Sequence, residues 1–268
     1  MGRIWDLSRL PHLDETQHID FQVDPTCDDV IAIGGNLSPG LLLSAYRQGL
    51  FPWYNEGENI YWWSPRQRFV IFLDDLHISK SLCKKMRRSL VPPKSGVFGE
   101  NSPARFSLDE AFAKVIGACA ARRREATWIT AEMQYAYIKL HALGYAHSAE
   151  LWLRRPDAGE FLAGGLYGVS LGHCFYGESM FSLVPDASKM AFAALGLFLR
   201  DQGFRLVDCQ QESAHFERFG ARLLPREEFE SCLHRFLTGR VCWQDYRAQF
   251  PDGPSLRELL RFPDSTKI

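Results

Sequence analysis

One acidic residue stands in an otherwise apolar, glycine-rich pair of predicted strands, residues 164–169 and 177–182. This residue is Glu178. A buried carboxylate costs several kcal/mol unless it is paired or neutralised, and glycines inside strands mark bulges or close approach of a ligand to the backbone. Two interpretations follow: a buried acid with a specific partner, or a tight hairpin that leaves Glu178 in solvent. The residues alone favour neither.

A second pair of polar residues ends the predicted strand at residues 205–210. Because alternate residues of a strand share a face, Asp208 and Gln210 are expected to project together, with Val207 and Cys209 on the other side. The Asp can hold a proton or a cation, and the Gln amide can both donate and accept, so the pair could align an amine and steady a developing negative oxygen. The alternative is a strand end with two polar side chains in water.

Neither a metal nor a cofactor is predicted. The seven cysteines are scattered without a C-x-x-C pair, and the eight histidines lack the H-E-x-x-H spacing. Coenzyme A is disfavoured because residues 183–188 lack a glycine-rich turn. Pro185 has no N–H to offer, and Asp186 places an anionic side chain where a pyrophosphate would sit.

Composition limits the class of protein. The 268 residues, 46% of them hydrophobic, can bury a full-sized core. The 31 Lys and Arg against 32 Asp and Glu exclude binding along an extended nucleic-acid duplex, so any such contact is local. No segment has the roughly 20 apolar residues of a membrane span, and residues 1–6 lack the apolar core of a signal peptide. A cytoplasmic protein is therefore expected, with no membrane contact.

The first part of the chain predicts a small N-terminal domain over residues 1–70. Ser38 and Pro39 begin a helix that ends at Gly49. An aromatic cluster follows at residues 51–54 and 61–65; such rings are mostly core or interface, although one or two could stack on a base.

A basic amphipathic helix is predicted within residues 77–88. Its apolar stripe implies docking onto the body of the protein, and its five cations form either a solvated face or a local positive site. These cations are Lys80, Lys84, Lys85, Arg87 and Arg88.

The remaining pattern predicts an α+β domain over residues 71–240. A capping box at Ser107-Leu108-Asp109-Glu110 begins one helix, and Thr130 begins another. Three strands then form an antiparallel meander, and the helix from Pro185 leads to the strand at residues 205–210 by a parallel crossover. This order is that of an acetyltransferase-like (GNAT) mixed sheet with flanking helices. Residues 241–268 form a peripheral C-terminal extension.

Seven segments in register, within residues 30–238, resemble the leucyl/phenylalanyl-tRNA–protein transferase family. They are Gly49-Leu50-Phe51-Pro52-Trp53, Trp63-Ser64-Pro65, Thr127-Trp128-Ile129-Thr130, Gly164-Gly165-Leu166-Tyr167-Gly168-Val169, Gly177-Glu178-Ser179-Met180-Phe181-Ser182, Ala187-Ser188-Lys189 and Asp208-Cys209-Gln210. Seven ordered motifs are not explained by a shared fold class.

The resemblance implies an aminoacyltransferase that moves Leu or Phe, and less often Met, from aminoacyl-tRNA to the amino terminus of proteins beginning with Arg or Lys, which marks them for degradation. An aminoacyl ester is already activated toward attack by an amine, and the pKa of an α-amino group is about 7.7–8.0. The resemblance therefore implies metal-free aminolysis, in which the enzyme positions the amine against the ester and removes its proton without a strong base. The expected partners are the acceptor end of the tRNA and the protein substrate, and the expected state is a monomer.

Site residues are likewise implied by the resemblance. Asp208 and Gln210 would orient and deprotonate the attacking amine, and Glu178 would contact the α-amino group or ribose end of the donor. Trp53 and Trp128 would hold the terminal adenosine, and the basic helix would contact acceptor-stem phosphates. The donor side chain would enter an apolar pocket formed by Leu166, Met180, Phe192, Leu195, Leu199 and Val207.

One segment departs from the family pattern. Residues 213–220 differ from the expected His-Leu and Ser-Leu-Gly, which bears on the shape of the acceptor site. Two alternatives stay open: a related ligase that uses aminoacyl-tRNA on another amine, and a non-catalytic tRNA-binding protein.

Overall fold

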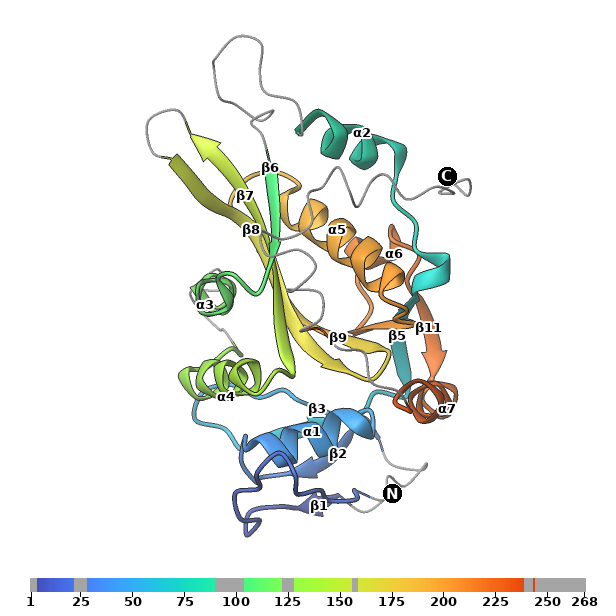
Figure 1. Ribbon diagram of the computed structural model, residues 1–268. Coiled ribbons are helices and arrows are strands. Elements are labelled where there is room, and N and C mark those ends of the chain that lie inside the picture. Colours follow the sequence, from blue (N-terminus) through green and yellow to red (C-terminus); the bar gives the residue numbers. More distant parts are fainter. Residues whose placement is uncertain are drawn as a thin grey trace.

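The computed structural model describes residues 4–21, 28–89, 104–121, 128–155, 159–238 and 243. It contains a four-stranded sheet in the order β1-β2-β4-β3 and a seven-stranded sheet in the order β11-β5-β10-β9-β8-β7-β6 (Figure 1). The predicted extension at residues 241–268 lies outside the described residues except for Trp243, which is buried beside α5 residues. Among the described helices, none combines the length and apolar composition needed to cross a bilayer.

The small sheet and one helix make up the N-terminal part of the chain. The strands are β1 (Trp5–Asp6), β2 (Val30–Ile33), β3 (Phe51–Pro52) and β4 (Tyr61–Trp63). Helix α1 (Pro39–Arg47) begins after Ser38 with a proline in its first turn, and Gly49 follows it at a φ of 78°, as the sequence predicts.

The large sheet carries the predicted meander and crossover. Its strands are β5 (Gln67–Phe72), β6 (Ala104–Leu108), β7 (Ala146–Arg155), β8 (Gly159–Leu171), β9 (Cys174–Ser182), β10 (Leu206–Gln210) and β11 (Arg222–Pro225). Strands β6 to β9 pair antiparallel in sequence order. Helix α5 (Ala187–Asp201) then leads to β10, which pairs parallel to β9. Both predictions are confirmed.

Helices cover both faces of the large sheet (Figure 1). Helices α5 and α2 (Lys80–Ser89) bury their apolar residues on one face. On the other face lie α1, α3 (Phe112–Ala121) and α4 (Ala131–Ala142). The shorter elements are η1 (Leu73–Asp75), α6 (Ala214–Glu217) and α7 (Arg226–Phe236). The fold is therefore a mixed sheet with flanking helices and an N-terminal part, and this much of the expected fold class is confirmed.

The capping box predicted at residues 107–110 is wrong. Residues up to Leu108 form strand β6, and the helix begins only at Phe112. The Ser107 hydroxyl donates to Glu150 at 2.6 Å, and Glu110 accepts from Arg105, so neither side chain caps a helix. The side chains that the local pattern assigns to a helix cap instead form hydrogen bonds with Glu150 and Arg105. By contrast, Thr130 does cap α4 by accepting from the Met133 N–H.

Two β-bulges interrupt neighbouring strands near the middle of the sheet. Between β8 and β9, Tyr167 lies opposite Ser179 and Gly168 opposite Gly177, so Glu178 is the extra residue. Between β10 and β5, the register shifts between Asp208 and Gln210. A Cβ at Gly168 would lie 2.2 Å from the Tyr176 carbonyl oxygen, so only glycine fits there. Bulges re-aim side chains, and these two turn Glu178 and Gln210 toward each other.

Candidate active site

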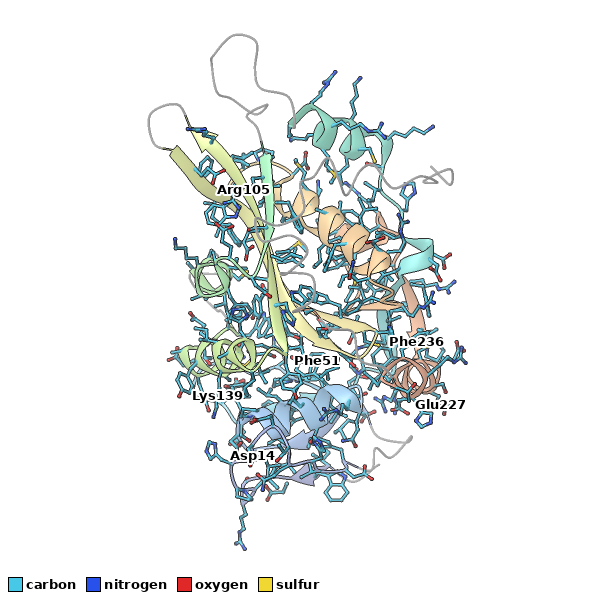
Figure 2. The ribbon with its side chains drawn as sticks, in the orientation of Figure 1. Asp14, Phe51, Arg105, Lys139, Glu227 and Phe236 are labelled. Atoms are coloured by element: carbon cyan, nitrogen blue, oxygen red, sulfur yellow. The ribbon has the colours of Figure 1, made fainter. Side chains whose placement is uncertain are left out.

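A cavity of about 920 Å³ opens where β9 parts from β10. The two strands pair only as far as Tyr176 and Asp208, whereas β9 continues to Ser182. Leu166 packs with the core on the α5 face and Tyr167 with the core on the α4 face, and both line the cavity. The cavity therefore reaches both faces of the sheet. Phe51, labelled in Figure 2, lines it from the N-terminal part.

Glu178 lies in the cavity wall with three hydrogen-bond donors around its carboxyl group. Tyr46 donates to Oε1 at 2.7 Å, Tyr137 to Oε2 at 3.1 Å and the Gln210 amide to Oε1 at 2.8 Å. Burial raises the pKa of Glu178 to about 7, and the nearby Asp208 charge adds to the rise, although the donors oppose it. Of the two interpretations of this residue, the acid with specific partners is confirmed.

The two tyrosines join the carboxyl group in one proton-sharing cluster. The Tyr46 and Tyr137 hydroxyls also hydrogen-bond to each other. The three contacts Tyr46–Tyr137, Tyr46–Glu178 and Tyr137–Glu178 each need one proton, and the two phenols supply only two protons. The cluster is therefore fully bonded when Glu178 carries a proton, and it lacks one donor when Glu178 is ionised. A group that gains and loses a proton near pH 7 is suited to general acid–base chemistry.

Asp208 and Gln210 do not act as the same-face pair that strand alternation predicts. Gln210 has a φ of 62° and lines the cavity with Val207 and Cys209, whereas Asp208 is not among the lining residues. The Asp208 Oδ1 accepts from the Gln210 backbone N–H at 2.8 Å. Because the bulge breaks the alternation, the Gln210 side chain reaches Glu178, and Asp208 instead holds the backbone of Gln210.

The Asp208 carboxylate forms a fully buried ion pair with Arg68 of β5. The Arg68 Nε and Nη2 atoms donate to its two oxygens at 2.8 and 2.6 Å, and both side chains are at most 1% exposed. Arg68 Nη1 donates to the Gly49 carbonyl at 3.0 Å, and its guanidinium lies 4.7 Å from the ring centres of Phe51 and Phe229. Through these contacts Arg68 joins the N-terminal part to strand β10.

The predicted pocket for an apolar side chain is partly assembled at the cavity. Leu166, Met180, Phe192 and Val207 line it. Leu195 and Leu199 are buried in the core around α5 but are not lining residues. The lining positions come from β8, β9, α5 and β10, so the apolar pocket lies on the α5 face.

Trp53 and Trp128 line the opposite side of the same cavity. Trp53 packs against Trp63 with ring centres 5.4 Å apart, and the Trp63 indole N–H donates to the Trp53 carbonyl at 2.9 Å. Both lining indoles are half-buried, which leaves ring surface for a ligand. Aromatic faces of this kind can stack on a nucleobase.

The basic helix is formed as predicted, as α2, but its cations do not all have the same surroundings. Lys80, Lys84, Arg87 and Arg88 are exposed. Lys85 instead donates to Asp186 at 3.0 Å and to the Pro185 carbonyl at 3.1 Å. Asp186 also accepts from Lys189 at 2.7 Å, and these contacts hold the pKa of Asp186 below its usual range. Lys85 thereby anchors α2 to the cavity rim.

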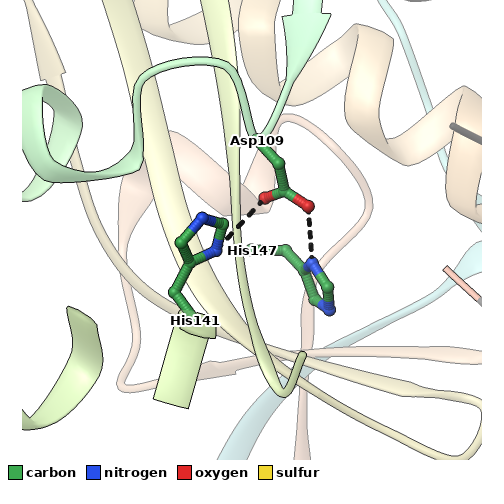
Figure 3. A group of neighbouring side chains, drawn as sticks. All are labelled: Asp109, His141 and His147. Atoms are coloured by element: carbon green, nitrogen blue, oxygen red, sulfur yellow. Dashed lines mark hydrogen bonds and ion pairs between the residues drawn. The ribbon is translucent and has the colours of Figure 1, made fainter. Parts of the chain in front are cut away.

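Asp109, His141 and His147 bring possible metal-ligand atoms within 4.8 Å of one another (Figure 3). His147 Nδ1 lies 2.8 Å from Asp109, and its Nε2 lies 3.2 Å from the Gly144 carbonyl oxygen. His141 Nδ1 lies 2.8 Å from the Ala146 carbonyl oxygen. A ring nitrogen can bond to a carbonyl oxygen only by donating a proton, and His141 Nδ1 and His147 Nε2 both face carbonyl oxygens. The group therefore joins the end of α4 to β7 by hydrogen bonds.

Sequence reasoning missed three residues of this site. Tyr46 and Tyr137 occupy buried positions of α1 and α4, where a periodic pattern shows only core. Arg68 lies in strand β5 directly before its buried apolar residues, and it could have been noticed as a cation that needs an acid. No local signal pairs it with Asp208, which is 140 residues away in the chain.

Comparison with known proteins agrees with the resemblance seen in the motifs. The model of the leucyl/phenylalanyl-tRNA protein transferase family matches residues 70–234, and the model of its N-terminal domain matches residues 35–66. A leucyl/phenylalanyl-tRNA–protein transferase of Stutzerimonas stutzeri is 47% identical over 221 residues, which cover 82% of this chain and 89% of the relative. One from an Anaeromyxobacter species is 48% identical over 223 residues, covering 81% and 88%.

A crystal structure of FemX covers 60% of both chains at 12% identity with a TM-score of 0.39, a likeness too low to carry an argument. The family models and the relatives instead match most of the chain, and the family models include the cavity strands β8, β9 and β10. The chain belongs to the leucyl/phenylalanyl-tRNA–protein transferase family.

Proposed function

We propose that this protein transfers Leu or Phe, and less often Met, from aminoacyl-tRNA to the N-terminal α-amino group of proteins that begin with Arg or Lys, and so marks them for degradation. The observation that carries the proposal is one cavity that joins an apolar pocket, two tryptophans and the hydrogen-bonded Glu178 carboxyl group. We further propose an acetyltransferase-like fold, a metal-free reaction, and a monomer that acts in the cytoplasm.

The donor would span the cavity from one face of the sheet to the other. Its apolar side chain would enter the pocket on the α5 face, where Leu166 and Phe192 line the wall. Its adenine would stack against Trp53 and Trp128 on the opposite side. In this arrangement the ribose and the ester would pass Glu178, which lines the same cavity.

In the reaction, the acceptor amine attacks the ester carbonyl carbon, a C–N bond forms, and the bond to the ribose oxygen breaks. The amine loses a proton and the leaving oxygen gains one. A carboxyl group with a pKa of about 7 can take the proton from an ammonium group with a pKa of about 7.7–8.0. In this proposal Glu178 takes the proton that the amine loses, Gln210 orients the amine, and Asp208 keeps Gln210 in place.

The charge of the cavity supports a cationic acceptor. Among its lining residues are the acidic groups Glu178, Asp186 and Glu212. Asp186 is paired with Lys85 and Lys189, so Glu178 and Glu212 are the acidic groups left to face an acceptor. Glu212 is exposed and directly precedes the segment that departs from the family pattern. Opposite charges would draw an amino terminus whose side chain is also cationic toward this opening.

A transfer assay tests the proposed function. Purified protein should move leucine from charged tRNA to a peptide beginning with Arg or Lys, and a matched peptide beginning with Asp should receive little. Transfer to the Asp peptide but not to the Arg peptide would indicate a ligase for another amine. Binding of tRNA without any transfer would indicate a non-catalytic protein.

Neutralising the exposed cations of α2 is expected to weaken tRNA binding. Lys84, Arg87 and Arg88 extend into solvent, and the slope of log affinity against log salt falls by about 0.7–0.9 for every phosphate that a cation no longer neutralises. The triple Gln variant should therefore bind charged tRNA less tightly and with a flatter salt dependence, as measured by filter binding at several salt concentrations.

The matched control for this variant is the exposed cluster on α7, where His234 and Arg235 lie in the last turn. Substituting Arg235 by Gln should leave the salt slope unchanged. If the α2 variant binds like the wild type, its cations form a solvated face and the predicted contact is wrong. Lys85 is kept in both variants because it anchors α2 through Asp186.

A further inference from the structure

A second cavity, which we call the side groove, lies between α2, α5 and α6 and has a volume of about 650 Å³. It shares three lining residues, Asp186, Lys189 and His215, with the cavity of the candidate active site, so the two adjoin each other. Ligand sites in proteins typically measure roughly 300–1,000 Å³. The side groove is therefore large enough to hold part of a substrate that extends out of the active site.

Hydrogen bonds between distant segments hold the walls of the side groove together. The His77 backbone N–H donates to the Phe219 carbonyl at 3.0 Å, which joins the segment before α2 to the segment after α6. Lys85 of α2 donates to Asp186, directly before α5, at 3.0 Å. Since both contacts form within the protein itself, the groove has its shape before any ligand enters.

Positive charge prevails in the side groove. Lys85 and Lys189 share the single carboxylate of Asp186, so this group keeps one positive charge. Arg218 is exposed and forms no ion pair with a described residue, and Glu217 is the other carboxylate. With the histidines neutral, three cations against two carboxylates give the groove a net charge of +1, whereas the whole chain carries −1. Such a site attracts an anion.

Of the two proposed substrates, the donor fits this charge and the acceptor does not. An acceptor that begins with Arg or Lys carries two positive charges, which Glu178 and Glu212 attract in the active site. The tRNA backbone carries one negative charge for each nucleotide. Its chain leaves the terminal adenosine at the ribose, so it can pass Lys189 while the adenine stacks elsewhere.

We infer that the side groove binds the phosphate groups of the nucleotides directly before the terminal adenosine of the donor, with Arg218 as their main contact. The inference rests on the proposed function, in which the exposed cations of α2 bind the acceptor stem. The groove is lined by α2 and adjoins the active site, so it connects these two regions. A guanidinium group presents its N–H donors in a planar fork that matches phosphate oxygens.

Arg218 belongs to the segment of residues 213–220 that departs from the family pattern. The contact is therefore an inference about this chain, and it gives that segment a role toward the donor instead of the acceptor. Because the Arg218 side chain is exposed, Arg218→Gln should keep the melting temperature of the wild type.

The experiment measures how well two trinucleotides inhibit transfer from leucyl-tRNA. One is uncharged CCA, and the other is CCA with a neutral methylphosphonate in place of each phosphodiester. Arg218→Gln should raise the inhibition constant of CCA by about 2–5-fold at low salt, and raising the salt concentration should reduce this difference. The inhibition constant of the neutral analogue should be the same for the variant and the wild type.

The matched control is Arg235→Gln, which removes an exposed arginine of α7 outside both cavities. It should match the wild type with both trinucleotides. Double-variant logic then assigns the lost affinity to one pair of groups, the Arg218 guanidinium and a donor phosphate.

Three results would overturn the inference. Inhibition of Arg218→Gln by CCA at the wild-type level would show that Arg218 binds no phosphate. An equal loss with the neutral analogue would assign the contact to a sugar or base. A higher KM only for acceptor peptides with acidic residues after the first position would show that the groove holds the acceptor chain.

Failure of the proposed function is a separate outcome. If the wild type transfers nothing from leucyl-tRNA, that function is wrong, and the inhibition assay has no signal. Direct titration of the same two trinucleotides into the wild type and Arg218→Gln then tests the groove by itself. A phosphate-dependent difference in affinity would support the inference, and equal affinities would overturn it.

Discussion

Replacing Asp208 by Ala is expected to lower the free energy of unfolding by about 3–5 kcal/mol, because it leaves the Arg68 guanidinium buried and unpaired. The loss should exceed that of an ordinary surface substitution, and urea unfolding measures it. Transfer activity should fall as well, since the Gln210 N–H loses its acceptor and the amide no longer stays beside Glu178.

The double variant Arg68→Met/Asp208→Leu is the control for this prediction. Replacing a buried ion pair by apolar residues of similar size is often neutral or stabilising, so the double variant should regain most of the stability. It should remain weak in transfer, because leucine cannot accept the Gln210 N–H. If Asp208→Ala instead loses activity at unchanged stability, Asp208 acts on the reaction itself, as the family resemblance suggested.

Replacing Glu178 by Gln is expected to lower kcat/KM by about 10²-fold or more. The amide keeps the size of the side chain but cannot take a proton from the amine. In the wild type, kcat/KM at limiting acceptor should rise with pH through about 7 as Glu178 ionises. The variant should lose this rise and keep only the titration of the acceptor amine, with a pKa of about 7.7–8.0.

The same variant should change how stability depends on pH. Because the pKa of Glu178 rises from 4.5 to about 7 on folding, the folded state holds the proton more tightly than the unfolded state. Its contribution to stability is full below pH 4.5 and is lost as the pH rises to about 7. The Gln variant should therefore gain on the order of 1–3 kcal/mol relative to the wild type at pH 8.

Glu212→Gln is the matched control, since this exposed carboxylate lines the same cavity. It should retain the rise of kcat/KM through pH 7 and show no gain of stability. A Glu178→Gln variant with the activity and pH profile of the wild type would contradict the assignment of the proton to this carboxyl group.

Local patterns predicted the elements that depend on neighbouring residues. Ser38 with Pro39 and Thr130 mark the beginnings of α1 and α4, and the alternation after His147 marks the meander, as the structure confirms. The capping box predicted at Ser107 is wrong because the hydrogen bond of this residue depends on a residue distant in the sequence. Its hydroxyl bonds to Glu150 across the sheet, a partner that no local pattern contains.

Part of the local geometry around Glu178 could be predicted from its glycine-rich segment. Glycine inside a strand predicts a bulge or a close approach, and the register confirms a bulge at this residue. The alternation rule then misassigned Asp208 and Gln210 to one face, because the second bulge reverses the alternation at the end of β10. A period of two holds only while each residue has an opposite partner.

By itself the sequence determined the family, the order of helices and strands, and the acid that lines the cavity, because these depend on residue types and short spacings. Tertiary structure decided the partners of that acid. Tyr46 and Tyr137 come from separate helices, and Arg68 reaches Asp208 across the sheet. Burial then raises the pKa of Glu178, and burial arises only when distant segments pack together.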